Sequence, residues 1–439
     1  MRSRLPELGM FLPFNRLLYG FPMRRFANFY IVLFLIDAGL SLTDELSTVF
    51  AAHLPVLSTV RNFVAFLVIV LSLVVYFLLG LDRRLPKRVL LPLTVYSFWC
   101  SLALWPLLDM ISRESQGLTA AFGQVFIVGV ALITLQNSYG RNLLPADLFQ
   151  RPMFGWRSTL VFSAVNLLLF PLVLVFSLMA AGSYYLDQET AGFMRLSPVG
   201  IYTSERSYHH ADKVVRLVAM MHVARKGYYQ ELFASLPAKG TIILVEGVTD
   251  QDRLLKGRFD YGRLANLVGL SSQGTMRLDG NLLELDDLGL ADDLVRDETK
   301  PDIVHADMDL NRFDPQTVEF LNVIARTLLG DKPLAQGLAA YSDWVKVHGT
   351  PEMISGVMAD ILYKRNAVVI DALQRSLDRY DTIVVPWGGM HMPAIESALL
   401  ERGVVPGAKK ERLLFAFSAI PFTVLWKGGG VSPVPKAPR

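Results

Sequence analysis

The chain has 439 residues, of which 52% are hydrophobic and 19% are charged, and its mean hydropathy is +0.36. An average soluble domain carries about 25% charged residues, so this composition disfavours an ordinary cytosolic globule, and the single cysteine excludes a disulfide scaffold. The formal net charge of +3 divides unevenly, because residues 1–183 have 14 Lys/Arg against 8 Asp/Glu (+6) and residues 184–439 have 29 against 32 (−3). The two parts are therefore expected to face different solvents.

Residues 1–183 are predicted to form a multi-pass membrane bundle. A helix needs about 20 apolar residues to cross the bilayer core, and apolar stretches of about that length recur along this part of the chain. The expected spans are 26–43, 62–81, 89–111, 118–136 and 159–181.

The basic residues predict the sidedness of this bundle. In chain order, the N-terminal segment and the four connections that follow it carry 5, 1, 4, 1 and 3 Lys or Arg. Basic residues concentrate on the cytoplasmic side of membrane proteins. The N-terminus is therefore expected in the cytoplasm and the C-terminal half outside it, in the inner membrane of a bacterium. A first segment lying on the surface would leave four spans and invert this sidedness, which the charge alternation disfavours.

Two acidic residues lie in or near the apolar stretches. A charge inside a bilayer is costly and can mark a functional site. Asp109 is close to the end of its stretch, and Asp37 has a neighbouring loop to reach. We therefore favour a structural interpretation of both, and the spans lack the broken, repeated pattern typical of transporters.

Residues 200–426 are predicted to form a soluble α/β domain with a largely parallel sheet. Buried strand patterns at 213–221, 242–245, 302–305, 382–386 and 412–417 alternate with helical patterns at 226–236, 315–329, 351–380 and 393–401. The acidic stretch 250–300 is interpreted as a solvated insertion. The Gly- and Pro-rich residues 427–439 are expected to be a flexible tail.

Two histidines are expected to meet at one edge of this sheet. His222 follows the first predicted strand, and His391 follows strand 382–386 after a glycine pair. Residues just beyond the carboxyl ends of parallel strands gather in one crevice. Because a neutral imidazole is a common ligand of divalent metals, the pair predicts a metal site.

Two carboxylates and an arginine occupy comparable positions. Glu246 directly follows a buried strand, and Asp307 stands two residues after His305 at the end of another. Glu246 with the two histidines would ligate a metal and leave a coordination position open for an activated water. Glu246 or Asp307 would transfer protons, and Arg365 would stabilise an oxyanion or hold the carboxylates.

The ordered motifs resemble those of the TraB/PrgY/Tiki superfamily, which is related more distantly to ChaN-like and erythromycin-esterase-like proteins. That family is marked by two Gly-x-x-His motifs, a Glu after the strand that follows the first, and an Arg on a helix before the second. Residues 388–391 read Gly-Gly-Met-His, whereas residues 219–222 read Ala-Met-Met-His, with Ala219 in the glycine position. Glu246 and Arg365 stand in the family's order. The resemblance spans about 213–399 and implies a membrane-anchored metalloprotease that uses Mn²⁺ or Co²⁺, with Zn²⁺ also possible, to cut peptide or protein substrates outside the cell.

Other interpretations of the same residues remain open. The histidines could be core or capping residues, and Glu246 could be a structural ion-pair partner of Arg253 or Arg365. The domain could also bind a haem- or pheromone-type ligand without hydrolysing it, as the ChaN-like relatives suggest. No phosphate-binding glycine loop and no basic stripe for nucleic acid occurs, so the expected partners are a peptide or protein substrate and the lipid bilayer.

Overall fold

The computed structural model describes residues 14–50, 54–111, 113–257, 271–272, 279–289, 296–328 and 334–419. The chain divides into two compact units, Met1–Ala181 and Gly182–Arg439, here called unit 1 and unit 2. The predicted tail 427–439 and much of the predicted insertion 250–300 lie outside the described residues.

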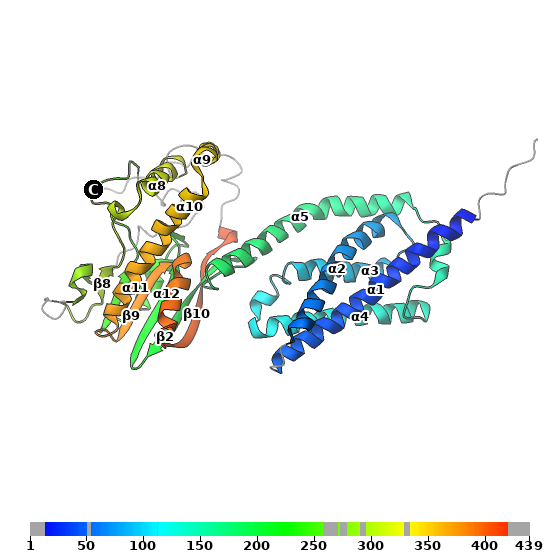
Figure 1. The fold of residues 1–439 in the computed structure, drawn as a ribbon, viewed down its shortest axis with the longest axis horizontal. Coiled ribbons are helices and arrows are strands. Elements are labelled where there is room, and N and C mark those ends of the chain that lie inside the picture. The colour runs from blue at the N-terminus through cyan, green and yellow to red at the C-terminus, as the bar shows by residue number, and fades with distance from the viewer. Residues whose placement is uncertain are drawn as a thin grey trace, which may run out of the picture. The chain divides into compact units, whose positions relative to one another are not determined.

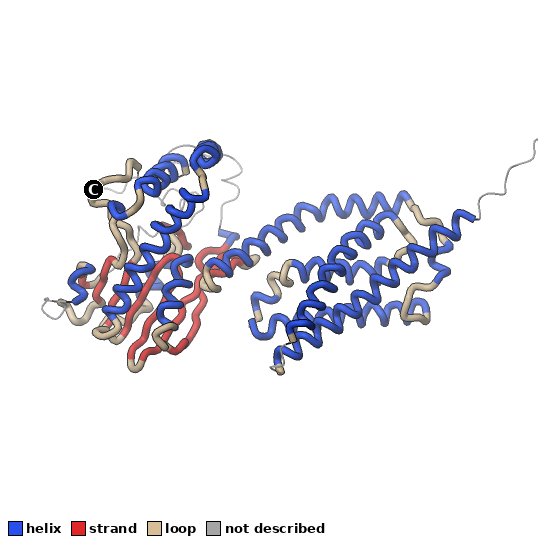
Figure 2. The backbone as a smooth tube through the Cα atoms, in the orientation of Figure 1, coloured by secondary structure: helices blue, strands red, loops and turns tan. Residues whose placement is uncertain are grey.

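Unit 1 is helical (Figures 1 and 2). Its helices are α1 (Phe14–Val49), α2 (Pro55–Leu81), α3 (Lys87–Ser101), α4 (Arg113–Tyr139) and α5 (Trp156–Glu189), of which α5 runs on into unit 2. Among the described residues, four helices are long and apolar enough to cross a membrane: Met23–Val49, Pro55–Leu81, Ser115–Tyr139 and Trp156–Glu189. They contain or overlap four of the five predicted spans and indicate membrane association.

The third predicted span, 89–111, differs from the structure. Helix α3 has 15 residues and ends at Ser101, ten residues before the predicted end. Ala103 and Leu104 then adopt positive φ angles of 51° and 49°, and the indole of Trp99 donates to the carbonyl of Trp105 at 2.7 Å. A proline disfavours the helical conformation of the residue before it. Pro106 therefore opposes the continuous helix that hydropathy alone would predict.

The chain nevertheless passes between the two ends of unit 1 along this segment. Lys87 at the start of α3 bonds to Ser158 near the start of α5, at 3.1 Å, and this defines the first end. Beyond α3, the carbonyl of Leu108 accepts from Gln116 of α4 at 2.9 Å at the second end. The five helical segments therefore cross unit 1 in alternating directions, although α3 is short.

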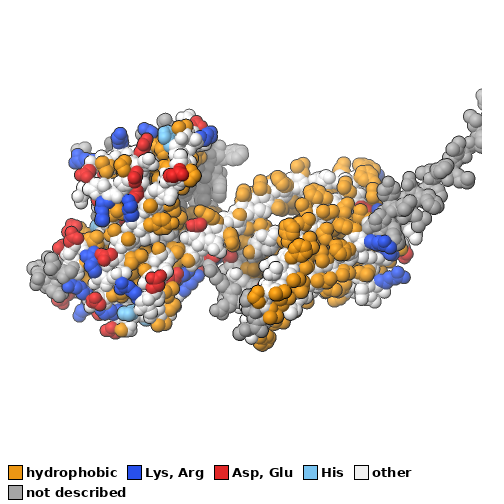
Figure 3. Space-filling view, in the orientation of Figure 1, with side chains coloured by type: hydrophobic (Ala, Val, Ile, Leu, Met, Phe, Trp, Pro, Cys, Tyr) orange, Lys and Arg blue, Asp and Glu red, His pale blue; other side chains and the backbone are white. Residues whose placement is uncertain are grey.

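The surface of unit 1 is apolar where a bilayer would contact it. Side chains such as Phe66, Phe77, Phe126, Leu167 and Leu168 are more than half exposed. Hydrophobic side chains cover most of the face of unit 1 seen in Figure 3, whereas charges of both signs are scattered over unit 2. Such an apolar band is unfavourable in water and favourable against lipid.

Unit 2 contains a mixed, mostly parallel sheet. Its strands are β1 (Met194–Leu196), β2 (Gly200–His210), β3 (Lys213–Met220), β5 (Thr241–Val245), β7 (Asn281–Leu283), β8 (Asp302–His305), β9 (Thr382–Gly388) and β10 (Val405–Ala416). They lie in the order β1-β2-β3-β9-β5-β8-β7, and β10 pairs with β2. The pairs from β3 to β7 are parallel, whereas those of β2 with β1, β3 and β10 are antiparallel. A small second sheet pairs β4 (Val223–Ala224) with β6 (Ser271–Ser272).

The predicted strands are present in unit 2, with an addition at one edge. The long strand β2 was not expected, and β10 begins seven residues before the predicted 412. The parallel strands are buried along most of their length, as expected of strands covered on both faces. Their side chains form the core of unit 2, with Trp387 and Leu217 among its fully buried members.

The helices of unit 2 are α6 (Tyr228–Ala234), α8 (Pro315–Thr327), α9 (Leu334–His348), α10 (Pro351–Met358), α11 (Arg365–Ser376) and α12 (Met392–Leu400). Asp314 caps α8 by accepting from the backbone NH of Gln316, as its position before Pro315 predicts. The predicted helical stretch 351–380 consists of α10 and α11 joined by a π-helical turn, Ala359–Lys364. Helices α11 and α12 contact β5 and β3, respectively.

Candidate functional site

The carboxyl ends of four neighbouring parallel strands bring the predicted site together. Strands β3, β9, β5 and β8 are adjacent in that order. His222, His391, Glu246 and Asp307 follow those strands within three residues of their ends. The backbone positions of these four residues therefore lie at one edge of the sheet, as expected from the strand pattern.

Arg365 joins two of these strand ends. Its Nε and Nη2 donate to Oδ1 and Oδ2 of Asp307 at 2.9 and 2.7 Å, and Nη2 also donates to Oε1 of Glu246 at 2.8 Å. The side chains of Arg365, Glu246 and Asp307 are 9%, 7% and 0% exposed. A two-pronged arginine–carboxylate contact of this kind is among the strongest charge-assisted hydrogen bonds. We call Glu246, Asp307, Arg365 and His391 the strand-end cluster.

Backbone amides hold the two carboxylates as well. Asp307 accepts from the amides of Gly247 and Met308 at 2.9 and 2.8 Å. Glu246 Oε2 accepts from the amide of Gly388 at 2.7 Å. Both carboxylates are therefore fixed from the sheet side and from α11, so their buried charges are compensated.

His391 completes the cluster. Its Nδ1 donates to Oδ1 of Asn366 at 2.7 Å, so Nε2 is the unprotonated ring nitrogen. That nitrogen lies 3.4 Å from Nη1 of Arg365 and 3.7 Å from Oε1 of Glu246. The ring meets the indole of Trp387 edge-on, with centroids 5.0 Å apart.

The pKa of His391 is lowered to about 4, chiefly because the ring is buried. Glu246 and Asp307 oppose this shift, whereas Arg365 and His222 contribute to it. The imidazole is therefore neutral near pH 7 and can accept a proton at Nε2.

The other predicted histidines are exposed beside the cluster. His222 is exposed in the turn after β3, although its charge acts on His391. His305 is exposed at the end of β8, and its Nδ1 lies close to Gly247, whose amide donates to Asp307.

The predicted metal ligands are His222, His391 and Glu246. A metal ion held by Glu246 and His391 would compete with the Arg365 guanidinium, which donates to Glu246 at 2.8 Å and lies 3.4 Å from Nε2 of His391. Within the described part of the chain, no group of three or more His, Cys, Asp or Glu has the geometry of a metal site. The guanidinium itself supplies the positive charge that these carboxylates require.

No family model, curated protein or solved structure matches this chain. The family resemblance therefore stays a prediction, and the chemistry is argued from the strand-end cluster.

Two members of the site were not predicted from the sequence. Asn366 fixes the orientation of the His391 ring, and Trp387 supports it while its indole donates to the carbonyl of Leu244 at 3.0 Å. Each adjoins a predicted residue or motif: Asn366 follows Arg365, and Trp387 precedes Gly388. This adjacency was the only available signal, because the contacts depend on how α11 and β9 pack together.

Proposed function

We propose that unit 1 embeds the protein in a membrane and that unit 2 hydrolyses peptide or protein substrates at the strand-end cluster. The observation that carries the proposal is a buried, neutral His391 whose Nδ1 is fixed by Asn366 and whose Nε2 faces Glu246 and Arg365. A base held in one tautomer beside a carboxylate and a cation is the arrangement that acyl hydrolysis requires. The peptide substrate class comes from the family resemblance.

In the proposed reaction, His391 Nε2 removes a proton from the attacking water. Glu246, 3.7 Å away, stabilises the imidazolium that forms. The proton then passes from Nε2 to the leaving amine. Asn366, which accepts from Nδ1, takes the place of the group that orients the base in other hydrolytic sites, and Glu246 lies on the Nε2 side.

Arg365 has two roles in this proposal. It holds Glu246 and Asp307 through Nε and Nη2, and its Nη1 lies beside Nε2 of His391. Negative charge that develops on the substrate carbonyl next to His391 would therefore form close to the guanidinium. A positioned donor of this kind is worth about 10²–10³ in rate.

The family resemblance implies a metal-dependent route instead, and the experiment must distinguish it from the proposed metal-free route. In the proposed route, the chain's own residues activate the water, because the Arg365 guanidinium already contacts Glu246 and His391, two of the three predicted ligands. Chelation is therefore expected to leave the activity unchanged.

We further propose that the first end of unit 1 faces the cytoplasm and that unit 2 is exoplasmic. Among the described residues of unit 1, ten Lys or Arg lie at the first end against two, Arg61 and Arg113, at the second. Those at the first end are Arg16, Arg24, Arg25, Arg83, Arg84, Lys87, Arg88, Arg141, Arg151 and Arg157. Five crossings from a cytoplasmic N-terminus leave the chain after α5 on the opposite side. A reporter fused after Arg439 tests this sidedness, and activity of a cytoplasm-specific reporter would contradict it.

The activity test uses the full-length protein in lipid nanodiscs with pools of fluorogenic peptides. His391→Gln and Glu246→Gln should each lower kcat/KM by about 10²–10⁴. His348→Gln is the matched control, because His348 is exposed on α9 outside the cluster. Equal turnover by His391→Gln and the wild type would refute the proposal.

Two further arms separate the alternatives. Loss of activity in EDTA with recovery on addition of Mn²⁺ or Co²⁺ would replace the proposed route by the metalloprotease route. Retention of a peptide or haem ligand, without turnover of any pool, would instead favour a binding module.

A further inference from the structure

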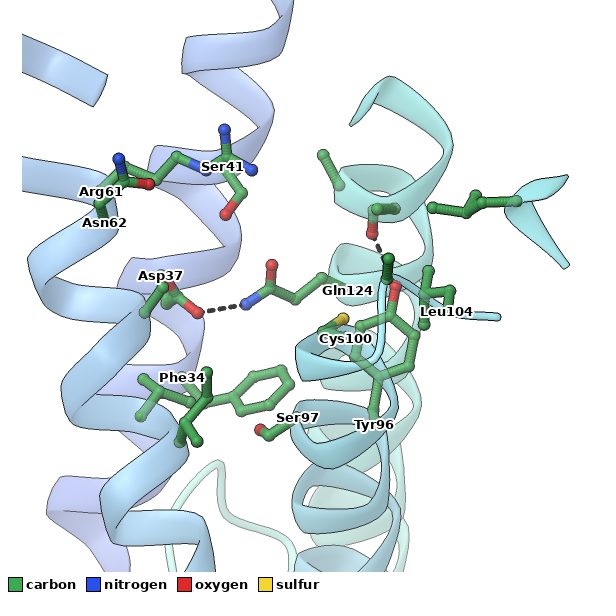
Figure 4. Close-up of a pocket in the computed structure, with 17 residues that line it drawn as sticks. Phe34, Asp37, Ser41, Arg61, Asn62, Tyr96, Ser97, Cys100, Leu104 and Gln124 are labelled. Atoms are coloured by element: carbon green, nitrogen blue, oxygen red, sulfur yellow. Dashed lines mark hydrogen bonds between the residues drawn. The ribbon is translucent and has the colours of Figure 1, made fainter. Parts of the chain in front are cut away.

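A cavity of about 210 Å³ lies within unit 1 among α1, α2, α3 and α4 (Figure 4). Its polar lining residues include Asp37, Ser41, Arg61, Asn62, Tyr96, Ser97 and Gln124. Apolar side chains, among them Phe34, Val68 and Leu104, line the remainder.

Asp37 is the buried acid of this cavity. It is 4% exposed, and its Oδ2 accepts from the amide Nε2 of Gln124 at 2.6 Å (Figure 4). Its Oδ1 is also buried and has no hydrogen-bond partner among the described residues. The sequence-based expectation that Asp37 reaches a neighbouring loop is therefore wrong. A carboxylate in this position requires a donor or a positive charge from another source.

The basic residue of the cavity is already neutralised. Nη1 of Arg61 donates to Oδ2 of Asp44 at 3.0 Å and to Oε1 of Glu45 at 2.9 Å. Among the described residues that line the cavity, Asp37 is the carboxylate and Arg61 the cation, and the guanidinium is bonded to carboxylates outside the lining. The buried Oδ1 of Asp37 therefore favours a cationic donor over an anion.

We propose that this cavity binds a small organic cation through a primary ammonium group that donates to Oδ1 of Asp37. The apolar part of the ligand packs against Phe34, Val68 and Leu104. The cavity is larger than a bare metal ion needs, and hard cations require six or more oxygen ligands around one point. An amine with a short alkyl or aryl body matches both the buried acid and the apolar lining.

The native thiol provides a direct test, because Cys100 lines the cavity and is the only cysteine in the chain. The full-length protein in nanodiscs is treated with the cationic 2-aminoethyl or the anionic 2-sulfonatoethyl methanethiosulfonate, and labelling is followed by mass spectrometry. Rates are normalised to those of free 2-mercaptoethanol. The cationic reagent should react about tenfold faster than the anionic one.

Competition identifies the ligand class. Butylammonium chloride should slow labelling by the cationic reagent, whereas neutral 1-butanol of matched size should not. Asp37→Asn should abolish both the charge preference and the protection. Asp147→Asn is the matched control, since Asp147 is exposed in the helical turn Ala146–Gln150, and it should behave as the wild type.

Four outcomes would overturn the proposal. They are equal normalised rates for the two reagents, absence of labelling by either reagent, equal protection by 1-butanol, and protection by sodium chloride but not by butylammonium. The wild-type arms decide the matter even if Asp37→Asn fails to fold. None of these results depends on the hydrolytic activity of unit 2.

Discussion

Replacing Arg365 with methionine should destabilise unit 2 more than any surface arginine replacement. The change removes three charge-assisted hydrogen bonds of 2.7–2.9 Å to carboxylates that are 7% and 0% exposed. Backbone amides still hold Asp307 twice and Glu246 once, so the orphaned charges are partly compensated. Removal of one partner from a buried ion pair costs about 3–5 kcal/mol, and we expect a loss in unfolding free energy at the lower end, about 3 kcal/mol.

The assay is native-state hydrogen exchange of the full-length protein, read on peptides from β5, β8 and β9. Arg375→Met on the same helix is the control, because Arg375 pairs with Asp371 at 2.9 Å with side chains 35% and 62% exposed. Such a surface pair is worth about 0–1 kcal/mol. Arg365→Lys keeps the charge but loses the two-pronged contact, and should fall between them. If Arg365→Met cost no more than Arg375→Met, the cluster would not hold these strand ends together.

Three further predictions concern the same domain. Because burial lowers the pKa of His391 from 6.5 to about 4, only the unfolded state gains the proton between these values. The stability of unit 2 should therefore fall by up to about 3 kcal/mol as the pH drops from 6.5 to 4, and the fall should be smaller in His391→Gln. Hydrogen exchange across that range measures it, and identical profiles would contradict it. Ala219→Gly, which restores the family's motif, should cost about 1 kcal/mol, because Ala219 is fully buried in β3, and should not raise peptidase activity; a rise would show that the alanine limits the site. Trp387→Phe leaves the carbonyl of Leu244 without its donor and should cost about 1–3 kcal/mol in thermal unfolding, an expectation that an unchanged Tm would exclude.

The parallel strands could be predicted because each contains consecutive apolar residues. Runs such as Thr-Ile-Ile-Leu-Val at 241–245 are apolar on both faces, as parallel strands between helices must be. Once the strands are assigned, the rule that their carboxyl ends share a crevice brings Glu246, Asp307 and His391 together. The sequence therefore predicted the backbone placement of the cluster well.

The contacts within the cluster could not be predicted in the same way. The position of Arg365 between two carboxylates depends on the rotation of α11 against the sheet, which hydropathy does not encode. Strand β2 was missed because polar and apolar residues mix along it, and it is stabilised by partners distant in sequence. Asp37 was misjudged for a related reason, since its partner Gln124 lies 87 residues away on another helix.

The π-helical turn Ala359–Lys364 sets the direction in which Arg365 points from helix α11. An α-helix turns by about 100° per residue, and a π-helical turn accommodates one extra residue. The extra residue changes the rotation of α11 about its axis relative to α10. Helix α10 can therefore contact α8 while α11 contacts β5. Deletion of one residue between 359 and 364 would restore a regular helix and swing the guanidinium of Arg365 about a quarter turn from the carboxylates. The charge balance of the strand ends thus depends on the length of a six-residue turn as well as on the identity of the residues it aligns.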